Sequence, residues 1–589
     1  MLAALVAVPL VILPPAADIF GLPKLVVVAV AAAVGWLASP GRLRSIRMGA
    51  LEWAVVAYVG VVAISSLFSR SVLDSVFGSH QRYGGLLPLL VYLWFAALVV
   101  VAFRGRPDRL DLVPVAVVGS AAVVAAYVLL QTAGVDVYEW EQAAGGTTRY
   151  AAGFMGNPDF AGGLLGMALP FGVRAALMRN RWLFGAATLV VAAGLVATRS
   201  RGGLLAGAVG LLVLGIVERD RVPRRVWVGA GALTGVALAL VALRPSFVER
   251  TELLRTESVE ARGRQWAGAW QVFLDSPVIG TGPDTFEFAF PAHRSGEDGR
   301  TLGMQIADKP HNVLLEKATD TGVLGFAAYA AVIVLAFRRA RREAAVFVAG
   351  LAAYLAQAFV SIDVPPLALL GWVMIAGIVA ASAPAAKATR KQAPMVARTV
   401  AAAAVVVLGA VALRADLAAG SGDWETAASW HPGQPTYRFG AAFADERGRR
   451  FDEAMRHYDD VLAWQPHSVH ALAGRARALG QAGEYPAADG SWRRAAELDP
   501  HNWEVHNGHA LLLNAWSNAT RGDRDLRGRA VAKLELTLAI KPDHVPAWIN
   551  LAKLRAALGD PDGTRRAAEE ARRLDPANAE AASLLARLP

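Results

Sequence analysis

The chain has 589 residues, of which 55% are hydrophobic and only 18% are charged, and its mean hydropathy is +0.37. A soluble chain of this length would usually hold several domains with about a quarter of its residues charged. Much of the apolar content must therefore be buried in something other than water. The absence of cysteine excludes disulfides, thiolate metal sites and a cysteine nucleophile.

The net charge of +10 is unevenly distributed along the chain. Residues 417–589 contain 22 Lys and Arg against 23 Asp and Glu, which leaves 37 basic and 26 acidic residues for residues 1–416. The whole basic excess thus lies in the apolar part, which indicates membrane topology rather than a nucleic-acid partner. We expect a transmembrane domain over 1–416 and a soluble domain over 417–589.

The first part contains thirteen apolar runs that are long enough to be transmembrane helices. They lie at about 2–20, 22–39, 50–68, 84–103, 112–134, 158–178, 182–198, 202–218, 226–243, 311–337, 344–361, 364–383 and 397–415. The first run is broken at Pro14-Pro15 and has no basic residues before it, so a cleaved signal peptide is the weaker interpretation. The sequence predicts an all-α, polytopic membrane protein of about 12–13 transmembrane helices.

Basic residues cluster in all six even-numbered connections between these runs, as in Arg104, Arg106 and Arg109. Since basic residues near helix ends stay in the cytoplasm, the N-terminus is expected to be cytoplasmic. The long connection 244–310 and everything after residue 415 would then face the extracytoplasmic side. This orientation refers to a cytoplasmic (inner) membrane, and the Ala-, Arg- and Gly-rich composition fits a GC-rich bacterium.

The soluble part contains Pro-marked turns at a regular period. Prolines at 432, 466, 500, 542 and 576 are separated by 34, 34, 42 and 34 residues. A period of 34 is that of tetratricopeptide repeats, which stack helix pairs into an α-solenoid that binds peptides or partner proteins. We assign the eight extra residues of the long unit to the region Trp516–Asp523. Alternatively, the repeats only brace an oligomer or a loop.

Several arginines lie on the outer connections, against the topological bias. They are Arg82, Arg149, Arg199, Arg201, Arg262 and Arg264. Such residues suggest an anionic ligand, because the guanidinium group grips phosphate oxygens bidentately. Ion pairing with the acidic residues of 244–310 is the alternative. The membrane part has three histidines, all on outer connections, and His311 stands at the start of the tenth run.

The segment that starts at His311-Asn312 continues for nine residues to Gly322-Val323-Leu324-Gly325. This resembles the H-N-x9-G-x-x-G pattern of the O-antigen ligase family, which joins O-antigen ligases, O-antigen polymerases and protein O-oligosaccharyltransferases. Three upstream segments resemble further patterns of that family in the same order. They are Gly153–Asp159, Ser200-Arg201-Gly202, and Arg264-Gln265-Trp266 followed by Asp275–Gly282. The resemblance covers roughly residues 50–385.

The resemblance implies a GT-C-like membrane glycosyltransferase that moves a glycan from undecaprenyl pyrophosphate to an acceptor hydroxyl on the outer face. It implies catalytic roles for His311, Arg201 and Arg264, and it implies no metal or other cofactor. Arg82, Arg199, Asn157 and Asn312 are expected to bind substrate. An imidazole can serve as the base near neutral pH, and arginines can stabilise the departing pyrophosphate.

Other readings stay open at this point. A polymerase that uses the same donor would carry the same motifs, and the repeats slightly favour a glycan, lipid or protein acceptor in the cell envelope. A non-catalytic membrane scaffold that presents the repeats would tolerate substitution of His311, Arg201 and Arg264. A transporter is disfavoured, because the runs are nearly free of central charges and show no internal repeat. No nucleic-acid role is expected.

Overall fold

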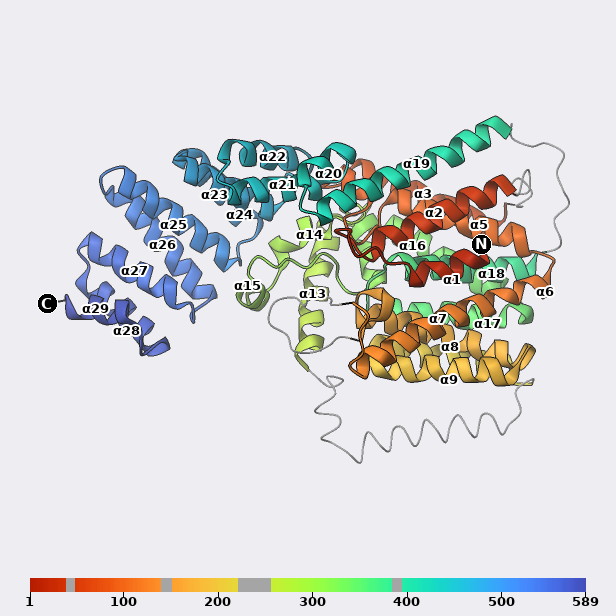
Figure 1. The fold of residues 1–589 in the computed structure, drawn as a ribbon. Coiled ribbons are helices and arrows are strands. Elements are labelled where there is room, and N and C mark those ends of the chain that lie inside the picture. Colours follow the sequence, from red (N-terminus) through yellow and green to blue (C-terminus); the bar gives the residue numbers. More distant parts are fainter. Residues whose placement is uncertain (39–47, 139–150, 221–255, 384–394, 589) are drawn as a thin grey trace, which may run out of the picture.

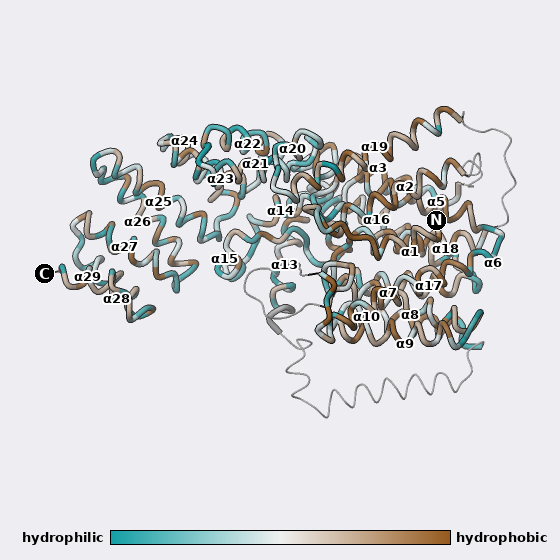
Figure 2. Tube along the Cα trace, viewed as in Figure 1, coloured by the Kyte–Doolittle hydropathy of each residue, from teal (hydrophilic) through white to brown (hydrophobic). Residues whose placement is uncertain are grey.

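The computed structural model describes residues 1–38, 48–138, 151–220, 256–383 and 395–588. Within these ranges all regular structure is helical, in agreement with the predicted all-α class. A helical bundle forms one end of the molecule and a curved array of helix pairs forms the other (Figure 1). Hydrophobic residues concentrate in the bundle and hydrophilic ones in the array (Figure 2). We call the end of the bundle that faces the array the repeat-side end.

Nine helices of the described residues are long and apolar enough to cross a membrane. They are α2 (Gly21–Ala38), α3 (Ala50–Leu67), α5 (Leu86–Phe103), Pro107–Thr132 (α6 and α7), α8 (Pro158–Met178), α9 (Arg181–Thr198), α16 (Val313–Arg339), α18 (Pro365–Ser382) and α19 (Met395–Gly420). Two shorter helices, α10 (Arg201–Val217) and α17 (Ala345–Ala358), pack with α8. The predicted run 226–243 and the outer Arg149 lie outside the described residues.

The first predicted run is not one spanning helix. Helix α1 covers only Leu2–Leu10, and residues 11–20 continue without helix to the start of α2. Pro14 and Pro15 lie in this stretch, where proline cannot supply a backbone donor. The ammonium group of Lys24 donates to the carbonyl oxygen of Val11, so a backbone acceptor released by the break is satisfied inside the protein.

Glycines allow the central helices of the bundle to approach closely. Where α8 meets α10, a Cβ added at Gly166 or Gly203 would collide with the facing backbone. Small residues at such crossings let membrane helices gain van der Waals contact that lipid cannot replace. This packing brings the N-termini of α8 and α10 together at the repeat-side end, where two of the quoted motifs lie.

The array consists of successive helix pairs joined to the bundle by α19. After α20 (Trp424–Trp430) come α21 (Pro435–Arg447), α22 (Phe451–Trp464), α23 (Val469–Ala482), α24 (Tyr485–Leu498), α25 (Trp503–Ala519), α26 (Arg524–Ile540), α27 (Val545–Leu558), α28 (Pro561–Leu574) and α29 (Ala579–Ala586). The five Pro-marked turns fall between pairs, as the 34-residue period predicts. The eight extra residues extend both 17-residue helices α25 and α26 as well as their turn, whereas α23, α24, α27 and α28 have 14 residues each.

Candidate functional site

Helix α16 is broken at Gly322, the first glycine of the motif after His311. Its backbone angles are φ 63° and ψ −166°, a region that is essentially restricted to glycine. A Cβ there would also collide with the backbone of Val278. The motif glycine is therefore needed for the backbone conformation and for the close approach of another segment.

The approaching segment is 277–282, which hydrogen-bonds to the backbone groups that the break exposes. The amides of Thr281 and Gly282 donate to the carbonyls of Thr319 and Asp320, at 2.9 and 3.0 Å. In return, the amide of Val323 donates to the carbonyl of Pro277 at 2.7 Å. Buried backbone polar groups need such partners, most of all at membrane depth. The segment Asp275–Gly282 and the motif Gly322–Gly325 thus form one structural unit.

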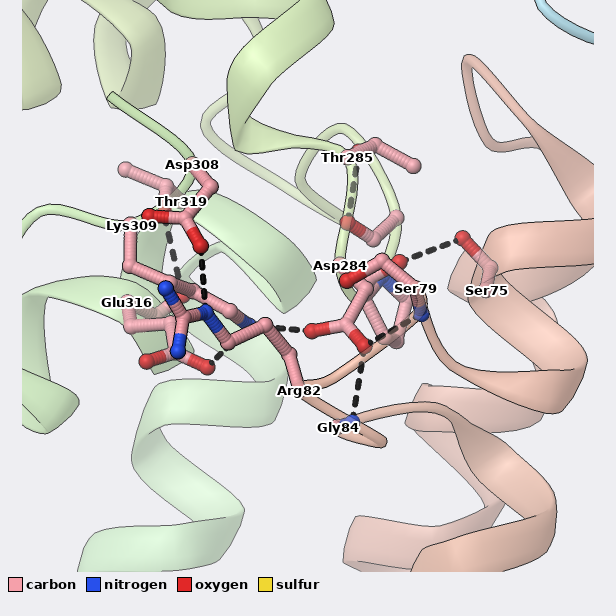
Figure 3. Close-up of polar contacts among 12 residues, drawn as sticks. Ser75, Ser79, Arg82, Gly84, Asp284, Thr285, Asp308, Lys309, Glu316 and Thr319 are labelled. Atoms are coloured by element: carbon pink, nitrogen blue, oxygen red, sulfur yellow. Dashed lines mark hydrogen bonds and ion pairs between the residues drawn. The ribbon is translucent and has the colours of Figure 1, made fainter. Parts of the chain in front are cut away.

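Hydrogen bonds and ion pairs join three loops at the repeat-side end (Figure 3). The loops contain residues 79–84, Asp284, and Asp308 with Lys309. Asp284 Oδ2 accepts hydrogen bonds from the amides of Ser79 and Gly84, at 2.8 and 2.7 Å. Asp284 Oδ1 accepts from the ammonium group of Lys309, which also reaches Glu316 Oε1 at 2.7 Å. The guanidinium group of Arg82, between Ser79 and Gly84 in sequence, pairs with Asp308.

His311 lines a pocket of about 390 Å³ at this end of the bundle. Two other predicted residues, Arg82 and Asn157, line the same pocket. Its remaining lining includes the apolar residues Ala17, Ile19, Phe20, Met155, Phe160, Ile362, Val364, Pro365 and Pro366, and the polar residues Asp18, Lys24, Gln81, Asp159 and Ser361. A pocket with an apolar wall and cationic groups suits a ligand that joins a lipid tail to an anionic head.

Burial lowers the pKa of His311 below the ordinary value of 6.5. The Asp308 carboxylate opposes this shift, while the cations of Arg262 and Arg82 add to it. A lowered pKa keeps the imidazole neutral at physiological pH, which is the form that can accept a proton. The backbone of His311 adopts φ 52°, an uncommon left-handed conformation for a residue other than glycine.

Asp159 lines this pocket and contacts two segments that are distant in sequence. Its Oδ1 accepts a hydrogen bond from the Ser200 hydroxyl at 2.8 Å, and its Oδ2 lies 3.5 Å from the guanidinium group of Arg262. Ser200 also accepts from the amide of Gly203 and so caps α10 directly before Arg201. The segments Gly153–Asp159 and Ser200-Arg201-Gly202 are thus joined by a direct contact, and Arg262, two residues before the motif that starts at Arg264, contacts the same carboxylate.

Four predicted site residues are not among the described residues that line the pocket. Arg264, on α13 (Thr256–Asp275), donates through Nε to Asp298 Oδ1 at 2.8 Å. Arg199 ends α9 in the left-handed region, and Arg201 begins α10. Asn312 caps α16 by accepting from the amide of Leu315 at 3.0 Å. The alternative of ion pairing with acidic residues of 244–310 is thus realised for Arg82 and Arg264, which contact Asp308 and Asp298. Arg262 also contacts a carboxylate, but its partner Asp159 lies outside that range.

Four residues of the pocket, Lys24, Asp18, Asp159 and Ser361, were not predicted from the sequence as site residues. Lys24 stands near the start of a predicted apolar run, and a lone cation in such a run is a usable signal. Asp159 lies inside a quoted motif, although no role was predicted for it. Asp18 accepts from the amides of Gly21 and Leu22 and from the Tyr83 hydroxyl, so it fixes the pocket wall. The contact between Asp18 and Tyr83, 65 residues apart, could not be predicted from the sequence.

The repeats contact the segment that leads to His311. Met304 helps line a groove of about 490 Å³ whose other walls come from the repeats, including Trp492, Trp503 and Asn507. The Met304 amide donates to Glu504 Oε1 at 3.0 Å. A buried ion pair of 2.7 Å joins Arg294 to Asp499 beside it. Part of the repeat groove is therefore occupied by the chain's own connection between α13 and α16.

Among the described residues, one group of three side chains has the spacing of metal ligands. It consists of Glu425, Asp445 and His457 in the first helices of the array. Arg450 already donates to Asp445 at 2.9 Å, and His457 lies 2.6 Å from Glu425. These contacts make the group a hydrogen-bonded brace, and none of its residues lines the His311 pocket.

Taken together, the bundle, the pocket at its repeat-side end and the appended helix pairs define a polytopic membrane protein with a tetratricopeptide-like array. Residues 186–330, from α9 into α16, match the sequence profile of the family described as O-Antigen ligase. The family resemblance is therefore confirmed over this segment. The segment includes Arg201, Arg264 and His311.

Solved structures resemble the array. The crystal structure of MamA protein is 19% identical, covering 26% of this chain and 78% of that chain with a TM-score of 0.23. YrrB, titled a TPR protein with an unusual peptide-binding site, is 15% identical, covering 32% and 88% with a TM-score of 0.24. The repeat assignment rests on the observed helix pairs and their period. The comparison with curated proteins finds no match.

Proposed function

We propose that this protein transfers a glycan from undecaprenyl pyrophosphate to an acceptor hydroxyl on the extracytoplasmic face of the bacterial cytoplasmic membrane. The observation that carries the proposal is the pocket in which His311 lies beside cations and an apolar wall, within a chain whose residues 186–330 match the O-antigen ligase family. Burial lowers the pKa of His311, which favours the form that can accept a proton. The basic residues at the opposite ends of the helices support this orientation.

In the proposed reaction His311 takes the proton of the acceptor hydroxyl. The acceptor oxygen forms a bond to C1 of the sugar while the bond between C1 and the pyrophosphate oxygen breaks, with inversion at C1. The electron pair stays on the departing pyrophosphate, where cationic side chains stabilise it. We assign this role to Arg201 and Arg264, with Arg82 and Arg199 as further contacts. Arg264 uses Nε for Asp298, so its two Nη groups can bind an anion.

Asn157 and Asn312 cap the starts of α8 and α16, and we propose that they also contact the substrate. The acceptor is a glycan, lipid or protein of the cell envelope, and the repeats supply a surface for a protein partner. A polymerase using the same donor is the second candidate, since the same residues would serve it.

Glycan profiling of a deletion strain tests the proposal and separates these candidates. Full-length lipid-linked chains should accumulate if a ligase is lost, and single repeat units if a polymerase is lost. Complementation with wild-type protein should restore the profile, and His311→Ala should not. Full complementation by His311→Ala would instead support a non-catalytic scaffold.

The reaction proposed here proceeds without a metal ion, because arginine side chains take the place of a metal on the pyrophosphate. Glycan transfer by purified protein should therefore persist in excess EDTA. A loss of transfer that added Mg²⁺ or Mn²⁺ restores would contradict this part of the mechanism.

A further inference from the structure

The geometry points to Asp284 and Lys309 as positioning residues. They hold the loop that carries Arg82 and the loop that carries His311 at a fixed separation. This inference rests on the proposed function, since it assigns the two residues to the same site. Neither residue lines the His311 pocket, so both act through the loops that they join.

Asp284 determines the path of the loop 79–84. One carboxylate oxygen accepts from the amides at both ends of this loop. Gln81 and Tyr83, on either side of Arg82, both have positive φ, at 72° and 52°. A loop with two residues in this uncommon region persists only where its surroundings impose it. Asp284 supplies that constraint, and it also has a positive φ of 56°.

Lys309 links Asp284 to the segment that contains His311. Its ammonium group lies between Asp284 and Glu316, and all three side chains are at most 2% exposed. Burial alone would lower the pKa of Lys309, but the two carboxylates outweigh it and raise the pKa. The lysine is thus charged and held from two sides. His311 follows two residues later, between Lys309 and the cap of α16.

A second contact between the two loops closes a ring. Arg82 pairs with Asp308, directly before Lys309, so the two loops are joined both at Asp284 and at their tips (Figure 3). A guanidinium group and an imidazole that act on one substrate must keep their separation, and a shift of about 1 Å can cost on the order of 100-fold in rate. The ring fixes that separation through Asp284, Lys309 and Asp308, none of which lines the pocket.

The experiment compares Asp284→Asn, Lys309→Met and the double variant in full-length protein. The amide side chain introduced by Asp284→Asn can still accept both backbone hydrogen bonds, but it carries no charge to hold the lysine. Each single variant removes one charge of the buried pair Asp284–Lys309 and keeps the other, with Lys309 still contacting Glu316 in Asp284→Asn, whereas the double variant removes one charge of each sign. The double variant should therefore recover thermal stability relative to the single variants. We expect kcat for glycan transfer to fall about 10- to 100-fold in all three, with KM changed less than about twofold. Lys309→Arg should retain more activity than Lys309→Met.

Asp74→Asn is the matched control, because Asp74 is a buried carboxylate nearby whose side chain contacts Ser71 and Gln465 instead of the two loops. It should lower stability without changing kcat. If the double variant recovers kcat together with stability, the two residues have only a structural role and the inference is wrong. Wild-type kcat in a folded single variant would also overturn it.

A second readout does not depend on transfer. Diethyl pyrocarbonate modifies neutral imidazoles, and peptide mapping gives the rate at His311 alone. Release of the loop should make His311 react faster in the double variant than in wild type or in Asp74→Asn. If wild type shows no transfer but this difference is found, the proposed function fails and the positioning role stands. An unchanged rate contradicts the positioning role.

Discussion

At the scale of residues, the site depends on one imidazole whose protonation is controlled by its neighbours. His311 is kept neutral chiefly by burial, and Asp308 and Arg262 shift its pKa in opposite directions. Two of the arginines that the sequence marked as outer ones, Arg82 and Arg262, lie close enough to influence it. The sequence identified His311 and these cations by residue type and motif. It could not identify Asp284, because the contacts of Asp284 with Ser79 and Gly84 join segments about 200 residues apart. It could not identify Lys309 either, because the role of Lys309 depends on its contact with Asp284.

The pH dependence of kcat/KM tests the role of His311 as the base. The neutral form is active, so the rate should fall as pH drops through a pKa that lies below 6.5. Asp308→Asn removes a charge that raises this pKa and should move the acidic limb to lower pH. Arg262→Gln removes a charge that lowers it and should move the limb to higher pH. Shifts in the same direction, or a limb well above pH 6.5, would contradict the assignment.

At the scale of elements, the glycine motifs determine how α16 is broken. The sequence showed a conspicuous pair of glycine segments, and it predicted one continuous run over 311–337. The structure instead interrupts the helix at Gly322 and inserts residues 277–282 there. The run could not reveal this, because hydropathy is unaffected by a change of backbone angle at one glycine. The Pro-marked turns of the repeats, in contrast, were predictable because each turn is local.

Substitution of Gly322 by alanine should be severely destabilising. The added Cβ would collide with Val278, and the φ/ψ region would be strained by about 1–3 kcal/mol in addition. Gly60→Ala is the control, because nothing lies within 4 Å of its Cβ position in α3. We expect a lower midpoint of thermal unfolding in detergent for Gly322→Ala only. Equal midpoints for the two variants would show that the break is not required.

At the scale of the whole molecule, the repeats and the membrane part are joined at the segment before His311 and at the end of α19. The amide of Asp18, on the turn between α1 and α2, donates to the Asp416 carboxylate in α19 at 2.8 Å. His80 lies 2.8 Å from the same carboxylate, and Tyr437 of the repeats donates to it at 2.9 Å. The sequence predicted both parts, and the structure adds that they share buried polar contacts. The repeats are thus positioned to brace the connection between α13 and α16.

The ion pair between Arg294 and Asp499 should hold this arrangement together. Both side chains are at most 1% exposed, and removal of one partner of such a pair costs about 3–5 kcal/mol. Asp499→Asn should therefore increase hydrogen–deuterium exchange in residues 294–306. Asp562→Asn, which changes an exposed carboxylate on α28, should have no effect there. Unchanged exchange in Asp499→Asn would mean that the repeats do not restrain the segment.

The most direct test of the central claim is transfer by the purified protein in lipid. Wild-type protein, an undecaprenyl-pyrophosphate glycan and acceptor should yield glycosylated acceptor and free undecaprenyl pyrophosphate in equal amounts. His311→Ala should remain folded and lose the reaction by about 100-fold or more, in line with the usual contribution of a general base. Full activity of folded His311→Ala would contradict the account.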